Sequence, residues 1–98
     1  MITNFKLFEN KHPKLNIGDY VIIKVSEDRN HWMSSDKIDF FESNIGIVDR
    51  LKQEYFGVEF EEKFDGDNYF FFDYDEIDFN SKNKTDAEAY LASKKYNL

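Results

Sequence analysis

The acidic residues of this sequence are the ones whose number and spacing could do chemistry. Between Glu54 and Asp78 the chain carries ten Asp and Glu residues and a single Lys63, so this window has a net charge of −9, against −7 for the whole sequence. Carboxylates at this density can bind a divalent cation, transfer protons in catalysis, or attract a positively charged partner. The residues around them decide which of these is expected.

A metal site is the first possibility. Four of the acids have the relative spacing of ligands in a calcium-binding EF-hand loop: Asp65, Asp67, Asp73 and Glu76. Phe70, however, stands where such a loop needs glycine for its sharp turn, and no flanking helices are indicated. We therefore expect neither a metal site nor a cofactor.

Catalysis would need groups that the sequence does not supply. Paired catalytic carboxylates require a cleft that gives them different protonation states, whereas the consecutive acids Asp73, Asp75 and Glu76 are expected to face solvent on a turn. With His12 and His31 as the only histidines and no cysteine, a nucleophile–base pair has almost no material. We predict that the protein is not an enzyme.

The bulk composition describes one folded domain. The chain has 98 residues, of which 18% are aromatic and 34% charged, a mixture that can build one modest core. It has no cysteine and no apolar run of the length of a signal peptide or membrane span, which predicts a cytoplasmic protein without membrane association. The charge of −7 opposes direct nucleic-acid binding and favours a basic partner.

Apolar alternation and turn residues predict a mainly β fold. Four runs are typical of strands: 15–25, 45–51, 55–62 and 69–72. A fifth, short strand is expected near residues 78–79. The run 69–72 is apolar on both faces, which predicts a central or covered strand. A capping box from Thr85 to Glu88 predicts a short helix over 86–95.

The strand predicted over 55–62 has the clearest inner and outer faces. Phe56, Val58 and Phe60 alternate with residues expected to face outward: Tyr55, Gly57, Glu59 and Glu61. We therefore expect the hairpin that begins here to have an aromatic inner face and an acidic outer face. In the first strand Ile22 falls on the second face, so we expect the N-terminal or C-terminal segment to cover it.

The segment 26–43 has no sustained period and many turn formers, which predicts a long irregular loop of the kind that often carries function. It contains Trp32, the single tryptophan of the chain. Two roles are open for Trp32. It either folds back with Phe40 and Phe41 to plug one end of the core, which we favour, or stands exposed as an anchor for a partner, since tryptophan is enriched at binding hot spots.

The order of these pieces resembles the small SH3-like β-barrels of the Tudor and KOW type. The matching residues are Leu15, Gly18-Asp19, Val21, Ile45-Gly46-Ile47-Val48, Gly57-Val58-Glu59-Phe60, Tyr69-Phe70 and a turn that ends at Ile77. The resemblance implies a single barrel of about five strands over 15–79. An N-terminal extension over 1–14 would precede it, and a polar linker with a short C-terminal helix over 80–98 would follow.

Barrels of this type are non-enzymatic modules that bind peptides or nucleic acid, so the resemblance implies a binding function. Tudor-like members enclose methylated lysine or arginine in an aromatic cage. The residues of this chain that such a cage would draw on are Trp32, Phe41, Tyr55, Tyr69 and Tyr74.

Two functions fit this sequence. The first is a small acidic, non-catalytic module that binds a protein partner with a basic surface. The second is a nucleic-acid mimic that inhibits a host DNA- or RNA-binding protein or a defence nuclease; the small size and a residue usage typical of AT-rich genomes suit a phage or mobile element. The oligomeric state is left open. The candidate partner-binding residues are Trp32, Tyr55, Glu59, Glu61, Glu62, Asp65, Asp67, Asp73 and Asp75.

Overall fold

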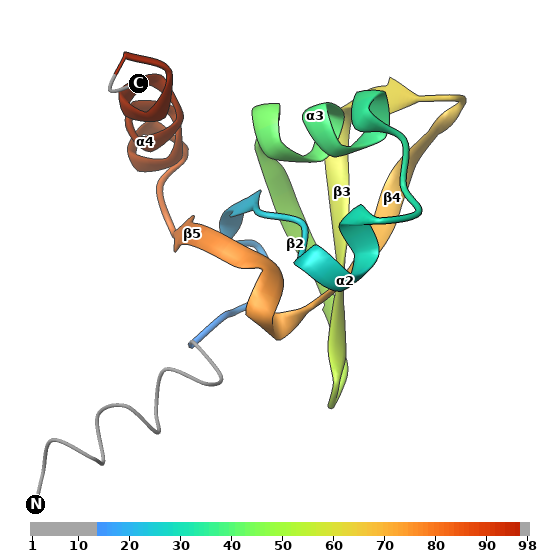
Figure 1. The fold of residues 1–98 in the computed structure, drawn as a ribbon. Helices are drawn as coiled ribbons and strands as arrows, with labels where there is room; N and C mark the ends of the chain where they lie inside the picture. The colour runs from blue at the N-terminus through green and yellow to red at the C-terminus, as the bar shows by residue number, and fades with distance from the viewer. Residues whose placement is uncertain (1–13, 97–98) are drawn as a thin grey trace, which may run out of the picture.

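The structure, a computed structural model, describes residues 14–96, with side chains through residue 95. Within this range the fold is mainly β, with one antiparallel sheet of five strands and three helices (Figure 1). No helix of the described range is long and apolar enough to cross a membrane. The elements are β1 (Tyr20–Ile23), α2 (Glu27–Asn30), α3 (Ser35–Ser43), β2 (Gly46–Leu51), β3 (Tyr55–Phe64), β4 (Asp67–Asp73), the 3-10 turn η1 (Tyr74–Glu76), β5 (Ile77–Ser81) and α4 (Lys84–Tyr96).

The predicted N-terminal extension over 1–14 lies outside the described residues except for Lys14. The strands are hydrogen-bonded in the order β4-β3-β2-β1-β5, which confirms the mainly β prediction and places β4 and β5 at the two borders of the described sheet. The expectation that 69–72 is a central or covered strand is wrong. β4 pairs only with β3 among the described strands, and its ring at Phe71 remains partly exposed instead of packing under another strand.

The core lies on the face of the sheet that α3 covers (Figure 1). Phe56, Val58 and Phe60 of β3 are buried there, as the alternation predicts. Phe41 of α3 packs edge-to-face on Phe72 of β4, with ring centroids 4.8 Å apart. Each buried phenylalanine contributes about 1.5–3 kcal/mol to the free energy of unfolding, so this cluster of rings accounts for much of the stability of the sheet.

Segment 26–43 is helical in two places and is not the irregular loop that the sequence predicts. The side chain of Ser34 caps α3 by accepting a hydrogen bond from the backbone N–H of Lys37 at 3.2 Å. Phe41 is buried in the core, as the plug hypothesis requires, but Trp32 is 74% exposed between the two helices. The plug role is therefore wrong for Trp32, which is available to a partner.

The C-terminal helix α4 docks on the sheet. It contacts β1 and β5, and the ring of Tyr90 stacks on that of Phe79 with centroids 4.5 Å apart and an interplanar angle of 7°. Ile22 is fully buried but does not belong to the main core cluster. Alternation along β1 puts it on the second face, and the contact of β1 with α4 agrees with the expected cover by the C-terminal segment.

The start of α4 differs from the prediction. The helix begins at Lys84, and Thr85 is inside it, so Thr85 does not cap the helix. The side chain of Asp86 instead accepts a hydrogen bond from the Ser81 hydroxyl at 2.9 Å, which ties the first turn of α4 to the end of β5. β5 continues through Ser81, two residues into the expected linker.

Candidate functional site

The outer face of β3 and β4 carries three aromatic rings that we call the aromatic row: Tyr55, Tyr69 and Phe71. Phe71 contacts both tyrosines edge-to-face, with ring centroids 5.3 Å apart in each pair. Gly57, which pairs with Phe71 across the two strands, lies beneath the row. A side chain at Gly57 would meet the Tyr69 hydroxyl and the Phe71 ring. The glycine therefore leaves room for the side chains of Tyr69 and Phe71 over β3.

One end of the aromatic row opens into a groove with a volume of about 440 Å³. We call it the aromatic groove; its lining residues are Arg29, Trp32, Tyr55, Phe71, Phe72 and Asp73. The residues Trp32, Tyr55 and Phe71 are 74%, 41% and 45% exposed. The two aromatic anchors predicted from the sequence thus meet at one site, and the exposed carboxylate of Asp73 lies beside them.

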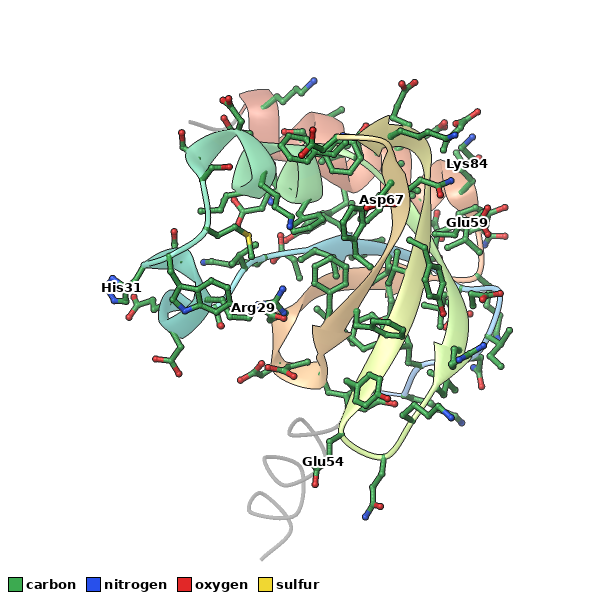
Figure 2. All side chains as sticks on the ribbon, turned by 90° about the vertical axis from the view of Figure 1, so that its right-hand side faces the viewer. Arg29, His31, Glu54, Glu59, Asp67 and Lys84 are labelled. Carbon is green, nitrogen blue, oxygen red and sulfur yellow. The ribbon has the colours of Figure 1, made fainter. Side chains whose placement is uncertain are left out.

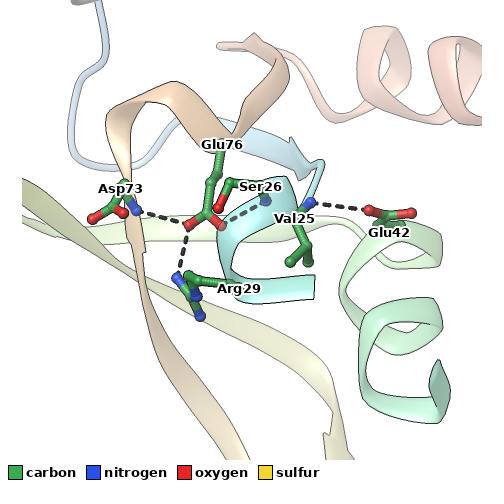
Figure 3. Close-up of polar contacts among 6 residues, drawn as sticks. All are labelled: Val25, Ser26, Arg29, Glu42, Asp73 and Glu76. Carbon is green, nitrogen blue, oxygen red and sulfur yellow. Dashed lines mark hydrogen bonds and ion pairs between the residues drawn. The ribbon is translucent and has the colours of Figure 1, made fainter. Parts of the chain in front are cut away.

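A buried carboxylate fixes the position of α2 at this groove. Glu76 is 0% exposed, and its carboxylate forms an ion pair with Arg29 Nη1 at 2.7 Å (Figure 3). It also accepts hydrogen bonds from the backbone N–H groups of Ser26 at 2.9 Å and Asp73 at 3.0 Å. These donors satisfy both carboxylate oxygens, as a buried charge requires. The expectation that the acids of this turn face solvent is therefore wrong for Glu76.

Sequence reasoning missed this role, although one signal for it existed. Asp73 and Glu76 have capping-box spacing, and both hydrogen bonds of the box are present at η1. Nothing in the sequence pointed to Arg29, whose guanidinium also lies 5.6 Å from the centre of the Phe72 ring. Because Trp32 lies two residues after the end of α2 and its backbone N–H donates to the Arg29 carbonyl at 3.4 Å, the Arg29–Glu76 pair also positions Trp32.

The second group of predicted residues lies at the other end of the β3–β4 hairpin. Five exposed acids there make up what we call the acidic hairpin: Glu59, Glu61, Glu62, Asp65 and Asp67. The connecting turn adopts left-handed backbone angles at Asp65 and Gly66, with φ of 57° and 90°, as the predicted Asp-Gly turn requires. The two ion pairs found within residues 14–95 involve Glu76 and Asp78, so none of the five acids forms an ion pair with a described residue.

A hollow of about 380 Å³ lies beside the acidic hairpin. Glu59, Glu61 and Asp49 line it together with Lys84 at the start of α4 and the apolar side chain of Ile47. Figure 2 shows Glu59 and Lys84 close together on this side of the molecule. With three carboxylates and one ammonium group among its lining residues, the hollow is negatively charged and suits a cationic group.

The structure therefore divides the nine predicted binding residues into two groups. Trp32, Tyr55 and Asp73 line the aromatic groove, and Asp75 is exposed nearby in η1. The other five form the acidic hairpin. The aromatic row lies between the groups, because Tyr55 pairs with Asp73 and Tyr69 pairs with Glu59. The outer face is thus not the continuous acidic surface that we expect from the alternation; its middle is aromatic.

The aromatic cage implied by the resemblance is only partly assembled. Trp32 and Tyr55 line the aromatic groove, and Tyr69 lies next to it in the aromatic row. Phe41 is buried in the core, and Tyr74 packs against the core, so these two rings do not line the groove. Phe71, which sequence reasoning did not select, takes part in their place.

The geometry suits non-covalent binding of a cationic group. Exposed rings attract cations through their negative faces, and nearby carboxylates add Coulomb attraction. Within residues 14–95 no cluster of three or more acidic or histidine side chains is placed to hold a metal ion.

Comparison of the chain with models of known protein families, with curated proteins and with solved structures gives no match. Of the residues on which the SH3-like resemblance rests, Leu15 and Gly18-Asp19 precede β1, Ile45 precedes β2, the others up to Phe70 lie on β1 to β4, and Ile77 begins β5 directly after η1. The structure thus supplies one sheet that contains these pieces in order, and the function has to be argued from the site itself.

Proposed function

We propose that this protein is a small non-catalytic binding module of the SH3-like barrel type, cytoplasmic, that docks a basic segment of a partner protein. The observation that carries the proposal is the meeting of Trp32, Tyr55 and Phe71 at one groove beside the carboxylate of Asp73. Such a groove favours lysine or arginine, because their aliphatic stems pack on rings while the cationic end reaches the carboxylate. The acidic hairpin then steers the basic partner toward the molecule.

The magnitudes favour the groove as the main source of affinity. A cation over an exposed aromatic ring contributes about 0.5–1 kcal/mol, and about 2 kcal/mol when it is desolvated. Truncation of a buried aromatic anchor at an interface costs about 2 kcal/mol or more. Exposed ion pairs contribute about 0.2–1 kcal/mol each and are screened by salt. Loss of Trp32 should therefore weaken binding more than loss of any single acid.

The single tryptophan provides the test, because fluorescence of Trp32 reports directly on the groove. We expect lysine- and arginine-containing peptides to change this fluorescence and acidic peptides of the same length to leave it unchanged. Tyr55→Ala should lower the affinity for the basic peptides at least tenfold, which corresponds to a loss of about 1.4 kcal/mol in binding free energy. Ile17→Ala, which removes an exposed apolar side chain outside the groove, is the matched control. Equal affinities for Tyr55→Ala and Ile17→Ala would exclude the groove as the binding site.

A second candidate is the nucleic-acid mimic, encoded by a phage or mobile element, that inhibits a DNA- or RNA-binding protein. It is favoured by one observation: the five acids of the acidic hairpin are exposed and form no ion pair with a described residue. Carboxylates in this state can occupy a basic groove in place of phosphates. In this case nucleic acid competes for the partner, affinity falls steeply with salt, and Glu59→Lys with Glu61→Lys abolishes binding while Tyr55→Ala has little effect.

One result would overturn both candidates. If the protein binds oligonucleotides at physiological salt, the net charge of −7 does not exclude nucleic acid, and the module is a direct nucleic-acid binder. An electrophoretic mobility assay with single- and double-stranded DNA and RNA makes this measurement.

A further inference from the structure

The aromatic groove lies at the free edge of β4. Phe71 and Phe72 are consecutive residues of a strand, so their side chains point to opposite faces of the sheet. Both nevertheless line the groove. Trp32 and Arg29 come from the α2 side and Tyr55 from the outer face of β3. A groove bordered from both faces of the sheet must follow the edge of the strand, and Figure 1 shows β4 at the border of the sheet.

The direction of the β4 backbone groups follows from one hydrogen bond. The N–H of Asp73 donates to the buried carboxylate of Glu76 at 3.0 Å, so it points away from β3. In an antiparallel pair the backbone groups of every second residue point to the same side. Phe71 and Tyr69 therefore also direct their N–H and C=O groups to the free edge, while Phe72 bonds to β3. No hydrogen bond found among residues 14–95 engages these outward groups of Phe71 and Tyr69.

We infer that this edge of β4 receives an extended basic segment of the partner protein as an additional strand of the sheet. This inference rests on the proposed function and adds to it how the partner is held. Backbone groups of Phe71 and Tyr69 would provide the hydrogen bonds, as in known strand-addition complexes. Alternate side chains of the segment then pack on the aromatic row or face Trp32 and Phe72.

Charge identifies the occupant as a basic partner and argues against a second copy of the chain. Asp67 and Asp73 are exposed at the two ends of β4, and Asp75 is exposed just beyond it. A basic segment lying along β4 meets a carboxylate at each end. Two β4 strands paired antiparallel about their centres would instead place Asp67 of one copy opposite Asp73 of the other, and like charges directly opposite are destabilising. Edge strands commonly avoid self-association in this way.

The experiment measures which backbone N–H groups of a bound peptide are needed. The probe is a pool of capped heptapeptides that alternate lysine or arginine with valine, with binding read from Trp32 fluorescence. The tightest member is then made in two N-methylated forms, one blocked at odd and one at even peptide nitrogens. In an extended strand these two sets point to opposite edges. We expect one form to bind at least about tenfold more weakly than the parent and the other to bind like the parent.

Two protein variants give an independent readout. Phe71→Pro removes the outward N–H, and an edge strand tolerates proline at a position whose N–H is not used in the sheet. Phe71→Ala removes the same ring but keeps the N–H, so it is the matched control. Phe71→Pro should lose more affinity than Phe71→Ala. In the wild-type protein, the amide hydrogens of Phe71 and Tyr69 should exchange more slowly once the peptide is bound.

The outcomes separate this inference from the proposed function. If both N-methylated forms bind like the parent peptide, the strand addition is wrong, while binding of a basic segment at the groove stands. If no basic peptide of the pool binds, both are wrong. If the protein sediments as a dimer that Phe71→Pro dissociates, the edge is occupied by a second copy, and the inferred partner is wrong.

Discussion

The turn η1 and the acidic hairpin are both rich in carboxylates, but only η1 places one of its carboxylates inside the molecule. At η1 Glu76 is fully buried and paired, while its sequence neighbour Asp75 is exposed. In the acidic hairpin all five acids are exposed, and none forms an ion pair with a described residue. The comparison teaches that the acidic window combines one internal charge that organises the fold with many outer charges available to a partner.

The largest effect expected from this comparison is the loss of the internal charge. Glu76→Ala leaves Arg29 and two backbone N–H groups without their acceptor in a buried site. Removal of one member of a buried ion pair costs about 3–5 kcal/mol. We therefore expect the free energy of unfolding to fall by about this amount, as measured by urea denaturation. Because the same pair positions α2, Trp32 fluorescence of the folded variant should also change.

Asp75→Ala is the matched control for Glu76→Ala. It removes the adjacent carboxylate, which is exposed, and surface substitutions of this kind usually change the free energy of unfolding by less than about 0.5 kcal/mol. If the two variants were equally stable, Glu76 would not organise the fold and the contrast drawn between the two regions would fail.

Asp78 is intermediate in burial between Glu76 and the exposed acids, and its removal should cause the next largest loss in the free energy of unfolding. It is half-buried, binds Lys94 Nζ at 2.9 Å and accepts a hydrogen bond from the Tyr90 hydroxyl at 3.2 Å. A partly exposed ion pair contributes about 0.2–1 kcal/mol and a hydrogen bond about 0.5–1.5 kcal/mol. Asp78→Ala should therefore lower the free energy of unfolding by about 1–2 kcal/mol and speed amide exchange in α4. Lys95→Ala, at the exposed neighbour of Lys94, should do neither.

The same contact predicts a dependence on alkaline pH. Burial, the charge of Asp78 and its hydrogen bond raise the pKa of Tyr90 above the ordinary value of 10.0, and Lys94 opposes this. A tyrosine with a raised pKa stabilises the folded state fully below pH 10. As pH rises further, the unfolded chain loses the proton first, so this contribution is lost through the folded-state pKa. The stability of the wild-type protein, measured by urea denaturation, should thus fall more as pH rises above 10 than that of Tyr90→Phe. If the free energy of unfolding of the two proteins changed equally with pH, the contact between Tyr90 and Asp78 would not contribute to the stability of the folded state.

The sequence predicted local structure well where one face of a strand is buried. Phe56, Val58 and Phe60 were placed correctly because strict alternation has a single packing solution. The prediction of a central or covered strand failed at β4. Phe71 and Phe72 are both apolar, and alternation cannot show whether another strand covers the outer ring. The sequence also failed to predict α2, because a helix of four residues is too short to show a period.

The candidate site was partly predictable for the same reasons. Trp32 and Tyr55 could be selected as anchors from residue type alone, but their meeting at one groove depends on Arg29 and Glu76, which are 47 positions apart. Pairing over such a distance leaves no pattern in a single sequence. The one local trace was the capping-box spacing that ends at Glu76.

The smallest effect on stability is expected from substitutions in the acidic hairpin. This result would distinguish its exposed carboxylates most clearly from the buried carboxylate of Glu76. Glu59→Lys with Glu61→Lys changes the net charge from −7 to −3, because each reversal adds two positive charges. Both residues are exposed, so the free energy of unfolding should change by less than about 0.5 kcal/mol per site, with a tendency to rise as self-repulsion decreases. Binding of a basic partner should weaken, most strongly at low salt. A loss of stability comparable to that of Glu76→Ala would show that these carboxylates also hold the fold together. An unchanged fold with weaker binding would leave recognition of a cationic partner as the physical reason for their density.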